Sequence, residues 1–247
     1  MKILGNQRSL SFLGVLCAVL GRSTVSFQPV KASSSKATRV TLLATPFEKA
    51  CESFEAAHAE DPRTIQVNGE TIPYSVHYHR RMVHHLKEME PNPKEEVELT
   101  ARCQHIRRWT RPRSEYPQGR KGYFDWRTAV KVFHAQQAAE ILLAAGYSQK
   151  VADRVGELLR KENLATDPDV QLLEDVICVV FLENEYTEFI DQEEFADSDA
   201  DAKLIRIIQK TWKKMTPRGH EAALKLAGQL TERGLRVVET ALAASAD

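Results

Sequence analysis

The chain has 247 residues, with 34 Lys and Arg, 34 Asp and Glu, and a formal net charge of zero. The charge is unevenly distributed, because residues 1–47 hold six basic residues and no acidic ones, whereas the rest of the chain has an acidic excess. About 200 residues follow this leader, enough for one domain with a sizeable core. They contain no internal repeat and no apolar stretch long enough to span a membrane.

The leader has two parts. Residues 9–20 form a short apolar run that ends near small residues, which predicts a signal peptide over residues 1–26. Residues 27–45 are rich in Ser, Thr, Lys and Arg, which predicts a plastid transit peptide. The combination resembles the bipartite presequence of algae with complex plastids, so we expect the plastid stroma. The alternative is a plain secretory signal with a disordered tail, but an odd number of remaining cysteines favours a reducing compartment.

Helical spacing of apolar residues dominates from residue 46 onward. Thr45-Pro46 begins the first helix, and residues 64–72 alternate around Asn68-Gly69, which predicts a short β-hairpin. Further helices are expected from residue 73, from 93 to about 108, from 123 to 145, after Ser148, from 168, around 204–212 and from 217 to the end. The sequence therefore predicts an all-α fold, a single helical bundle over residues 46–247.

Three polar residues interrupt apolar helical patterns: His105, His134 and Asp175. Unpaired polar groups are costly in a core, so these three either satisfy one another or bind a ligand. Two histidines and a carboxylate on different helices match a divalent metal site. The alternatives are core histidines bound to backbone carbonyls, and an Asp175 paired with Arg160 or an arginine near residue 107. The His-rich run over residues 76–85 is poorly phased for sharing an ion and is expected to be mostly solvated.

A cationic segment follows the first of these histidines. Residues 102–131 hold nine Lys or Arg and two acids, interleaved with aromatic residues. Guanidinium groups suit phosphate, and aromatic rings suit base stacking. The residues expected to bind phosphate are Arg102, Arg107, Arg108, Arg111 and Arg127. The alternative is intramolecular, because residues 162–201 carry fourteen acids and no base, and could cover the segment.

Several blocks of sequence resemble domain-of-unknown-function family 4202, over about residues 46–226. They are 102–109 (RCQHIRRW), 122–127, 133–135, 166–168, 173–175, 211–215 and 218–220. Members of that family are often labelled glutamyl-tRNA synthetase. We do not expect that activity, because such an enzyme needs a Rossmann domain, and this chain has neither the parallel strands nor the length for one.

The order of histidines and aspartate also resembles the HD phosphohydrolase superfamily. That resemblance implies an HD-like bundle in which His105, His134 and Asp175 bind a metal that activates water against a phosphoester. The chain departs from the pattern at Ile106, which stands where the aspartate of the His-Asp doublet would be.

The leading hypothesis is therefore an HD-like protein that binds a phosphorylated small molecule or nucleotide, with metal-dependent phosphohydrolysis as its activity. One alternative is a non-catalytic module that binds RNA or tRNA through the basic aromatic segment. Another is a structural role in which an acidic loop, residues 183–201, docks on that segment.

Overall fold

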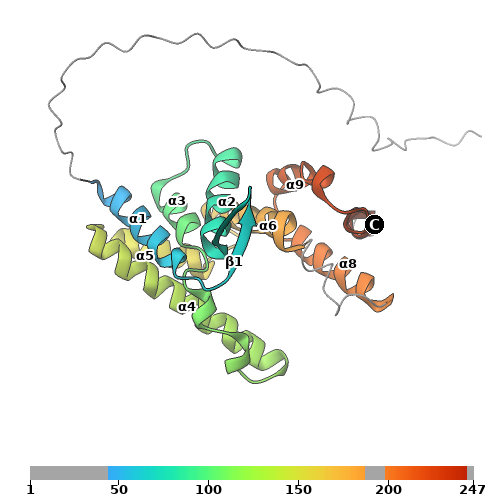
Figure 1. Cartoon of the computed structure of the whole chain (residues 1–247), viewed down its shortest axis with the longest axis horizontal. Helices are drawn as coiled ribbons and strands as arrows, with labels where there is room; N and C mark the ends of the chain where they lie inside the picture. Colours follow the sequence, from blue (N-terminus) through green and yellow to red (C-terminus); the bar gives the residue numbers. More distant parts are fainter. Residues whose placement is uncertain (1–43, 187–197, 244–247) are drawn as a thin grey trace, which may run out of the picture. The chain divides into compact units, whose positions relative to one another are not determined.

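A computed structural model describes residues 44–186 and 198–243. The predicted signal peptide, all but the last two residues of the predicted transit peptide, and most of the acidic loop lie outside the described residues. The elements in chain order, shown in Figure 1, are α1 (Pro46–Ala59), β1 (Thr64–Val67), β2 (Glu70–Pro73), α2 (Tyr74–Met89), α3 (Glu95–Cys103), α4 (Gly119–Ala145), α5 (Gln149–Arg160), α6 (Pro168–Val180), α8 (Ser198–Trp212), α9 (Pro217–Leu224) and α10 (Glu232–Ala243).

The prediction of an all-α fold with one small hairpin is confirmed. Thr45 caps α1 as expected, since its hydroxyl accepts from the Glu48 amide while the Glu48 carboxylate accepts from the Thr45 amide at 2.7 Å. Asn68 and Gly69 both have positive φ, 52° and 85°. Those angles belong to the tight turn that an Asn-Gly pair favours, and β1 and β2 pair antiparallel on either side of it.

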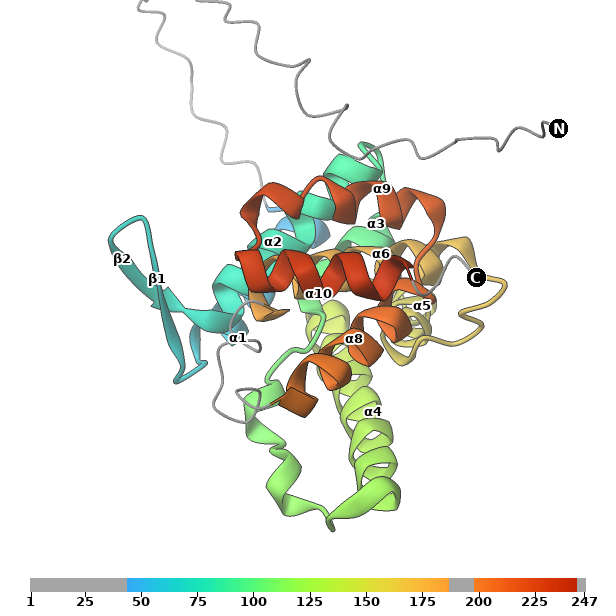
Figure 2. The same ribbon diagram turned by 90° about the vertical axis from the view of Figure 1, so that its right-hand side faces the viewer.

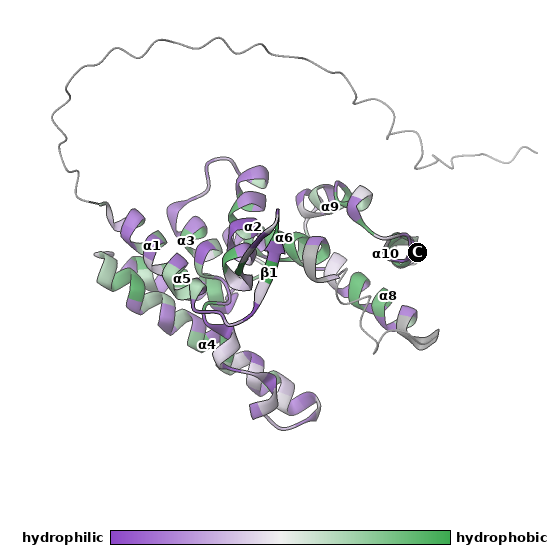
Figure 3. Cartoon of the chain, viewed as in Figure 1, coloured by the Kyte–Doolittle hydropathy of each residue, from purple (hydrophilic) through white to green (hydrophobic). Residues whose placement is uncertain are grey.

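The described helices bury their apolar faces in three clusters. One joins α1, α3, α4 and α5, a second joins α2, α3, α5 and α6, and a third joins α6, α8, α9 and α10. Figure 3 shows hydrophobic and hydrophilic residues mixed along single helices, as expected where each helix buries one side. No described helix is both long enough and apolar enough to cross a membrane.

The third helix is shorter than expected. It was predicted to continue to about Arg108, but it ends at Cys103 because Gln104 leaves the helical region with ψ 127°. His105 and Arg107 then take left-handed backbone conformations, with φ 62° and 49°. The basic residues that follow therefore lie on a loop with 3-10 turns rather than on the last turn of a helix.

Two other boundaries differ from expectation. The fourth helix begins at Gly119 rather than at residue 123. The last predicted helix is divided into α9 and α10 by a 3-10 turn at Ala227–Gln229, and the Thr231 hydroxyl accepts from the Gly234 amide at the start of α10. Thr231 acts as a new N-cap, so α10 begins as a separate helix with a different direction from α9.

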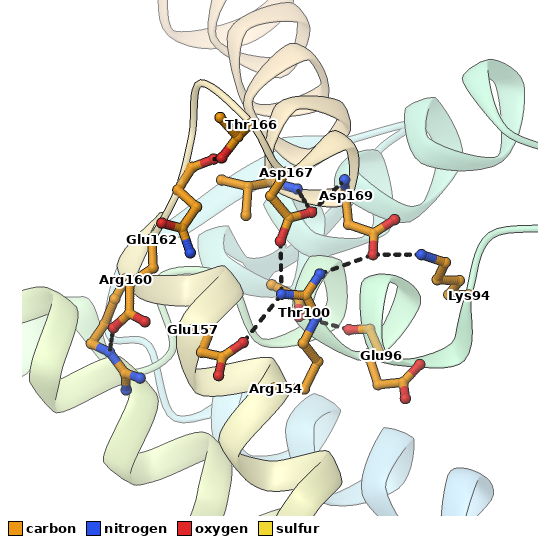
Figure 4. Close-up of polar contacts among 12 residues, drawn as sticks. Lys94, Glu96, Thr100, Arg154, Glu157, Arg160, Glu162, Thr166, Asp167 and Asp169 are labelled. Atoms are coloured by element: carbon orange, nitrogen blue, oxygen red, sulfur yellow. Dashed lines mark hydrogen bonds and ion pairs between the residues drawn. The ribbon is translucent and has the colours of Figure 1, made fainter.

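A polar network joins α5 to the start of α6 (Figure 4). The Arg154 guanidinium contacts the carboxylates of Glu157, Asp167 and Asp169 at 3.2, 2.7 and 3.0 Å. Asp167 is also the N-cap of α6, and Lys94, just before α3, reaches Asp169 at 2.9 Å. One arginine thus ties together three separate parts of the bundle.

Replacing Arg154 with alanine is expected to lower the free energy of unfolding by about 1–3 kcal/mol, because it removes several charge-assisted hydrogen bonds at once. Urea denaturation followed by circular dichroism measures this loss. Lys150→Ala, at an exposed position on the same helix, is the matched control and should change little. Equal losses in the two variants would contradict a stabilising role for the network.

Candidate functional site

The sequence motifs converge on a cavity of about 410 Å³ bounded by the end of α3 and by α4, α5, α6 and α8. Among the described residues, its wall includes two histidines, five basic residues and four aromatic residues, together with a single carboxylate. The histidines are His105 and His134, the basic residues Arg108, Arg127, Lys131, Lys161 and Lys214, the aromatic residues Tyr78, Tyr123, Trp126 and Phe181, and the carboxylate Glu174.

The structure brings His105 and His134 together, with ring centroids 5.6 Å apart. His134 comes from the middle of α4 and is only 2% exposed, whereas His105 lies on the turn that follows α3. Tyr78 from α2 stacks against the His105 ring at 5.5 Å. Two imidazoles from different elements therefore share one wall of the cavity.

Both imidazoles are neutral at physiological pH. Burial, reinforced by the Arg108 guanidinium, lowers the pKa of His134 to about 3 and that of His105 well below its ordinary value. The Nε2 atom of His134 is buried and has no hydrogen-bond partner among the described residues. A buried nitrogen without a partner carries a free-energy cost, so its retention beside a cavity is consistent with a ligand-binding role.

Two further histidines fix the turn that carries His105. The His58 ring donates to the Arg102 carbonyl at 2.8 Å, and the His79 ring contacts the Gln104 carbonyl. Their rings stack with centroids 3.5 Å apart. The last carbonyls of a helix lack partners within the helix, so these buried imidazoles satisfy groups that α3 leaves open.

The cavity is strongly cationic. Five basic side chains face one carboxylate, Glu174, which pairs with Lys161 and lies 3.7 Å from the Lys214 ammonium. Burial raises the pKa of Glu174, but these two ammonium groups outweigh burial and keep that pKa below its ordinary value. The net positive charge in a partly enclosed space favours an anionic ligand.

Two of the five arginines expected to bind phosphate line this cavity, namely Arg108 and Arg127. The other three lie elsewhere. Arg102 pairs with Glu98 at 2.6 Å, Arg107 forms two hydrogen bonds to the Glu60 carboxylate, and Arg111 stacks over the Phe133 ring. Arg107 and Arg111 follow the end of α3, so the spacing of a continuous helix does not apply to them, whereas Arg102 lies in the last turn of α3 and is held along the helix by Glu98.

Three lysines in the cavity were not among the residues predicted to bind phosphate, although Lys131 belongs to the cationic segment and Lys214 to one of the blocks that carry the family resemblance. Lys131 lies on α4, Lys161 follows α5 in a left-handed conformation, and Lys214 follows α8. Lys161 and Lys214 each lie just after the end of a helix and Lys131 lies in the middle of α4, so their spacing along the sequence does not show that they share a cavity. Only packing of three helices around α4 places them together.

Asp175 does not join His105 and His134. Its carboxylate accepts from the amide and the hydroxyl of Thr216, the N-cap of α9, with the amide at 2.8 Å. A β-carbon at Gly219 would lie 2.6 Å from Asp175 Oδ1, so the carboxylate is enclosed by the first turn of α9. Asp175 lines a different cavity, whose wall contains none of the histidines. The three residues predicted to hold a metal are therefore not assembled into one site.

A histidine–carboxylate group with ligand spacing occurs elsewhere among the described residues. One ligand atom from each of His84, His85 and Glu88 lies within 4.8 Å of the others. His85 is buried and also contacts Glu183 at 2.7 Å. His79 and His85 are both buried, so the expectation that the run over residues 76–85 is mostly solvated was wrong for these two.

The buried histidines predict acid sensitivity. Burial lowers the pKa of His58 to about 4 and that of His134 to about 3, whereas both take their ordinary value in the unfolded chain. As pH falls below about 6.5 the unfolded chain gains protons that the folded chain does not, so the free energy of unfolding falls by up to ~1.4 kcal/mol per pH unit per histidine.

The urea concentration at the midpoint of unfolding should therefore decrease steadily as the pH is lowered from 7.5 to 4.5. The slope should lessen in His134→Phe and persist in the exposed-site control His84→Ala; a midpoint independent of pH would exclude neutral buried imidazoles.

Comparison with known proteins gives a family and no activity. A family model described as "Domain of unknown function (DUF4202)" matches residues 48–238, most of the chain. No curated protein and no solved structure matches. Residues from several blocks that carried the sequence resemblance, among them His105, Trp126, His134, Glu174 and Lys214, line the cavity described above. The chain belongs to the DUF4202 family.

Proposed function

We propose that the cavity binds a phosphorylated small molecule or a nucleotide. The observation that carries this proposal is the concentration of five basic side chains around two neutral imidazoles, with one internal carboxylate. A phosphate group offers several acceptor oxygens and negative charge, which match ammonium and guanidinium donors. A neutral imidazole can add one further N–H donor without adding charge.

The aromatic part of the wall supports a ligand with a flat or apolar portion beside its phosphate. Tyr78 and Trp126 line the cavity, and Arg108 lies over the Trp126 ring at 4.8 Å. The volume of about 410 Å³ falls in the range of about 300–1,000 Å³ typical of small-molecule sites. A nucleoside phosphate satisfies both the charge and the aromatic surface, so it is our first choice of ligand.

Metal-dependent phosphohydrolysis, which the HD resemblance implied, fits the cavity less well. His105 and His134 offer two ligands, but Asp175 is occupied by Thr216 and Glu174 by two ammonium groups. Ile106 is fully buried in the core and offers no donor. Nearby cations also disfavour a divalent ion. The donor set therefore does not fit a metal held by His105, His134 and Asp175, and we propose ligand binding without that metal.

Arg127→Ala is expected to weaken binding of a nucleoside diphosphate about tenfold or more, because a charge-assisted hydrogen bond of ~1.5–3 kcal/mol is lost. Isothermal titration calorimetry with nucleoside mono- and diphosphates measures the change. Arg107→Ala is the matched control, since Arg107 is close in sequence but bonded to Glu60 outside the cavity. If no phosphorylated probe binds, or if both variants lose affinity equally, the cavity is not the binding site.

Removal of divalent ions should leave the affinity for a nucleoside monophosphate unchanged, because lysines and arginines supply the charge. Titrations with EDTA and with added Mn²⁺ or Zn²⁺ provide the comparison. A gain in affinity on adding metal that disappears in His105→Ala would contradict this expectation. Such a result would support the prediction, made from the sequence, that His105 binds a metal ion.

A further inference from the structure

The segment that leads into α4 forms a projection from the bundle. It comprises the 3-10 turns Arg108–Thr110 and Arg113–Glu115 and the first turns of α4, and we call residues 108–127 the basic arm. In Figure 2 the arm extends beyond the other helices, with the N-terminal half of α4 as its long side. Both views of the ribbon show its end away from the packed helices.

Internal contacts hold the arm in one shape. The Arg113 guanidinium donates to the carbonyls of Tyr116 and Pro117, each at 2.8 Å. The Trp126 indole donates to the Arg111 carbonyl at 2.9 Å. A β-carbon on Gly122 would lie 1.9 Å from the Pro117 carbonyl oxygen, so the loop packs directly on the helix. A surface ordered in advance loses less entropy when it binds a partner.

Arginines of the arm lie over aromatic rings. Arg120 lies over Phe124 and Arg127 over Tyr123, both at 5.7 Å. Neither arginine forms an ion pair within the described residues, unlike Arg80, which pairs with Glu55 at 2.6 Å on another surface. An arginine stacked on a ring keeps its charge and most of its donors, so these two remain able to bind phosphate.

The rings beneath these arginines are unusually exposed. Phe124 is 52% exposed and Tyr123 40%, whereas most other large apolar side chains of the described residues are buried or half-buried. Tyr123 and Arg127 also line the cavity, so the exposed surface of the arm is continuous with the cavity wall. Aromatic rings interleaved with arginines suit a chain of nucleotides, whose bases stack on rings and whose phosphates bind guanidinium groups, better than they suit the apolar surface of a folded protein.

We propose that the basic arm binds single-stranded nucleic acid and that the terminal phosphate of that strand occupies the cavity. The placement of the terminal phosphate in the cavity rests on the proposed phosphate-binding function of that cavity. Nucleotides next to the terminus stack on Tyr123 and Phe124, and Arg120 contacts the backbone phosphates. The cavity supplies recognition of the strand end, and the arm supplies affinity that is largely independent of sequence.

The test compares oligonucleotides with mononucleotides on the full chain. Fluorescence anisotropy is measured with short single-stranded RNA and DNA probes that carry a 5′-phosphate, a 3′-phosphate or no terminal phosphate. The phosphorylated probes should bind at least tenfold more tightly than a nucleoside monophosphate, with an affinity that falls steeply as salt rises. The affinities of the different probes show whether the protein prefers RNA or DNA, and whether it prefers a 5′-phosphate or a 3′-phosphate.

The double variant Arg120→Ala/Phe124→Ala should weaken oligonucleotide binding about tenfold or more, because both a stacking ring and a phosphate contact are lost. Its mononucleotide affinity should not change. Leu143→Ala, at a similarly exposed apolar position near the other end of α4, is the control. Circular dichroism confirms that each variant is folded.

The outcomes separate the two proposals. Oligonucleotides that bind no better than a mononucleotide, or equally well to the arm variant, overturn the arm as a nucleic-acid surface and leave the phosphate site intact. Tight oligonucleotide binding that ignores the terminal phosphate overturns the placement of the strand end in the cavity. Absence of binding by every phosphorylated probe overturns the proposed function itself.

Discussion

The early end of α3 is the constraint on which the cavity depends. If the helix continued past Cys103, its carbonyls would bond along the helix and His105 would point elsewhere. Instead, two stacked imidazoles bind the carbonyls of Arg102 and Gln104, and the chain turns through left-handed conformations at His105 and Arg107. Burying polar imidazoles costs free energy that their hydrogen bonds to the helix end offset in part.

The distribution of arginine partners divides the molecule into two electrostatic regions. In most of the bundle, arginines are neutralised by carboxylates, as in the network around Arg154. On the basic arm, Arg120 and Arg127 lie over aromatic rings instead, and Glu174 in the cavity wall pairs with two lysines. The charges of Arg120 and Arg127 are therefore less neutralised than that of Arg154, which favours the attraction of anions to the arm.

Much of the fold could be predicted from local signals. The Thr45-Pro46 and Asp167-Pro168 helix starts and the Asn68-Gly69 turn depend on neighbouring residues, and the structure contains all three. The site could be predicted only in part. His105 and His134 were identified because polar residues stand out in apolar patterns, but the end of α3 is set by His58 and His79, far away in sequence. Lys161 and Lys214 join the cavity through tertiary packing, and Asp175 faces away because Thr216 begins a helix beside it.

The buried carboxylate of Glu174 has a consequence for selectivity. It pairs with Lys161 and Lys214, so these two ammonium groups share one internal counter-ion. Any anion that approaches Lys161 and Lys214 competes for these two ammonium groups with the Glu174 carboxylate, which is already buried. Glu174 therefore offsets part of the positive charge of the wall, while Arg108, Arg127 and Lys131 also contribute positive charge and keep the wall cationic.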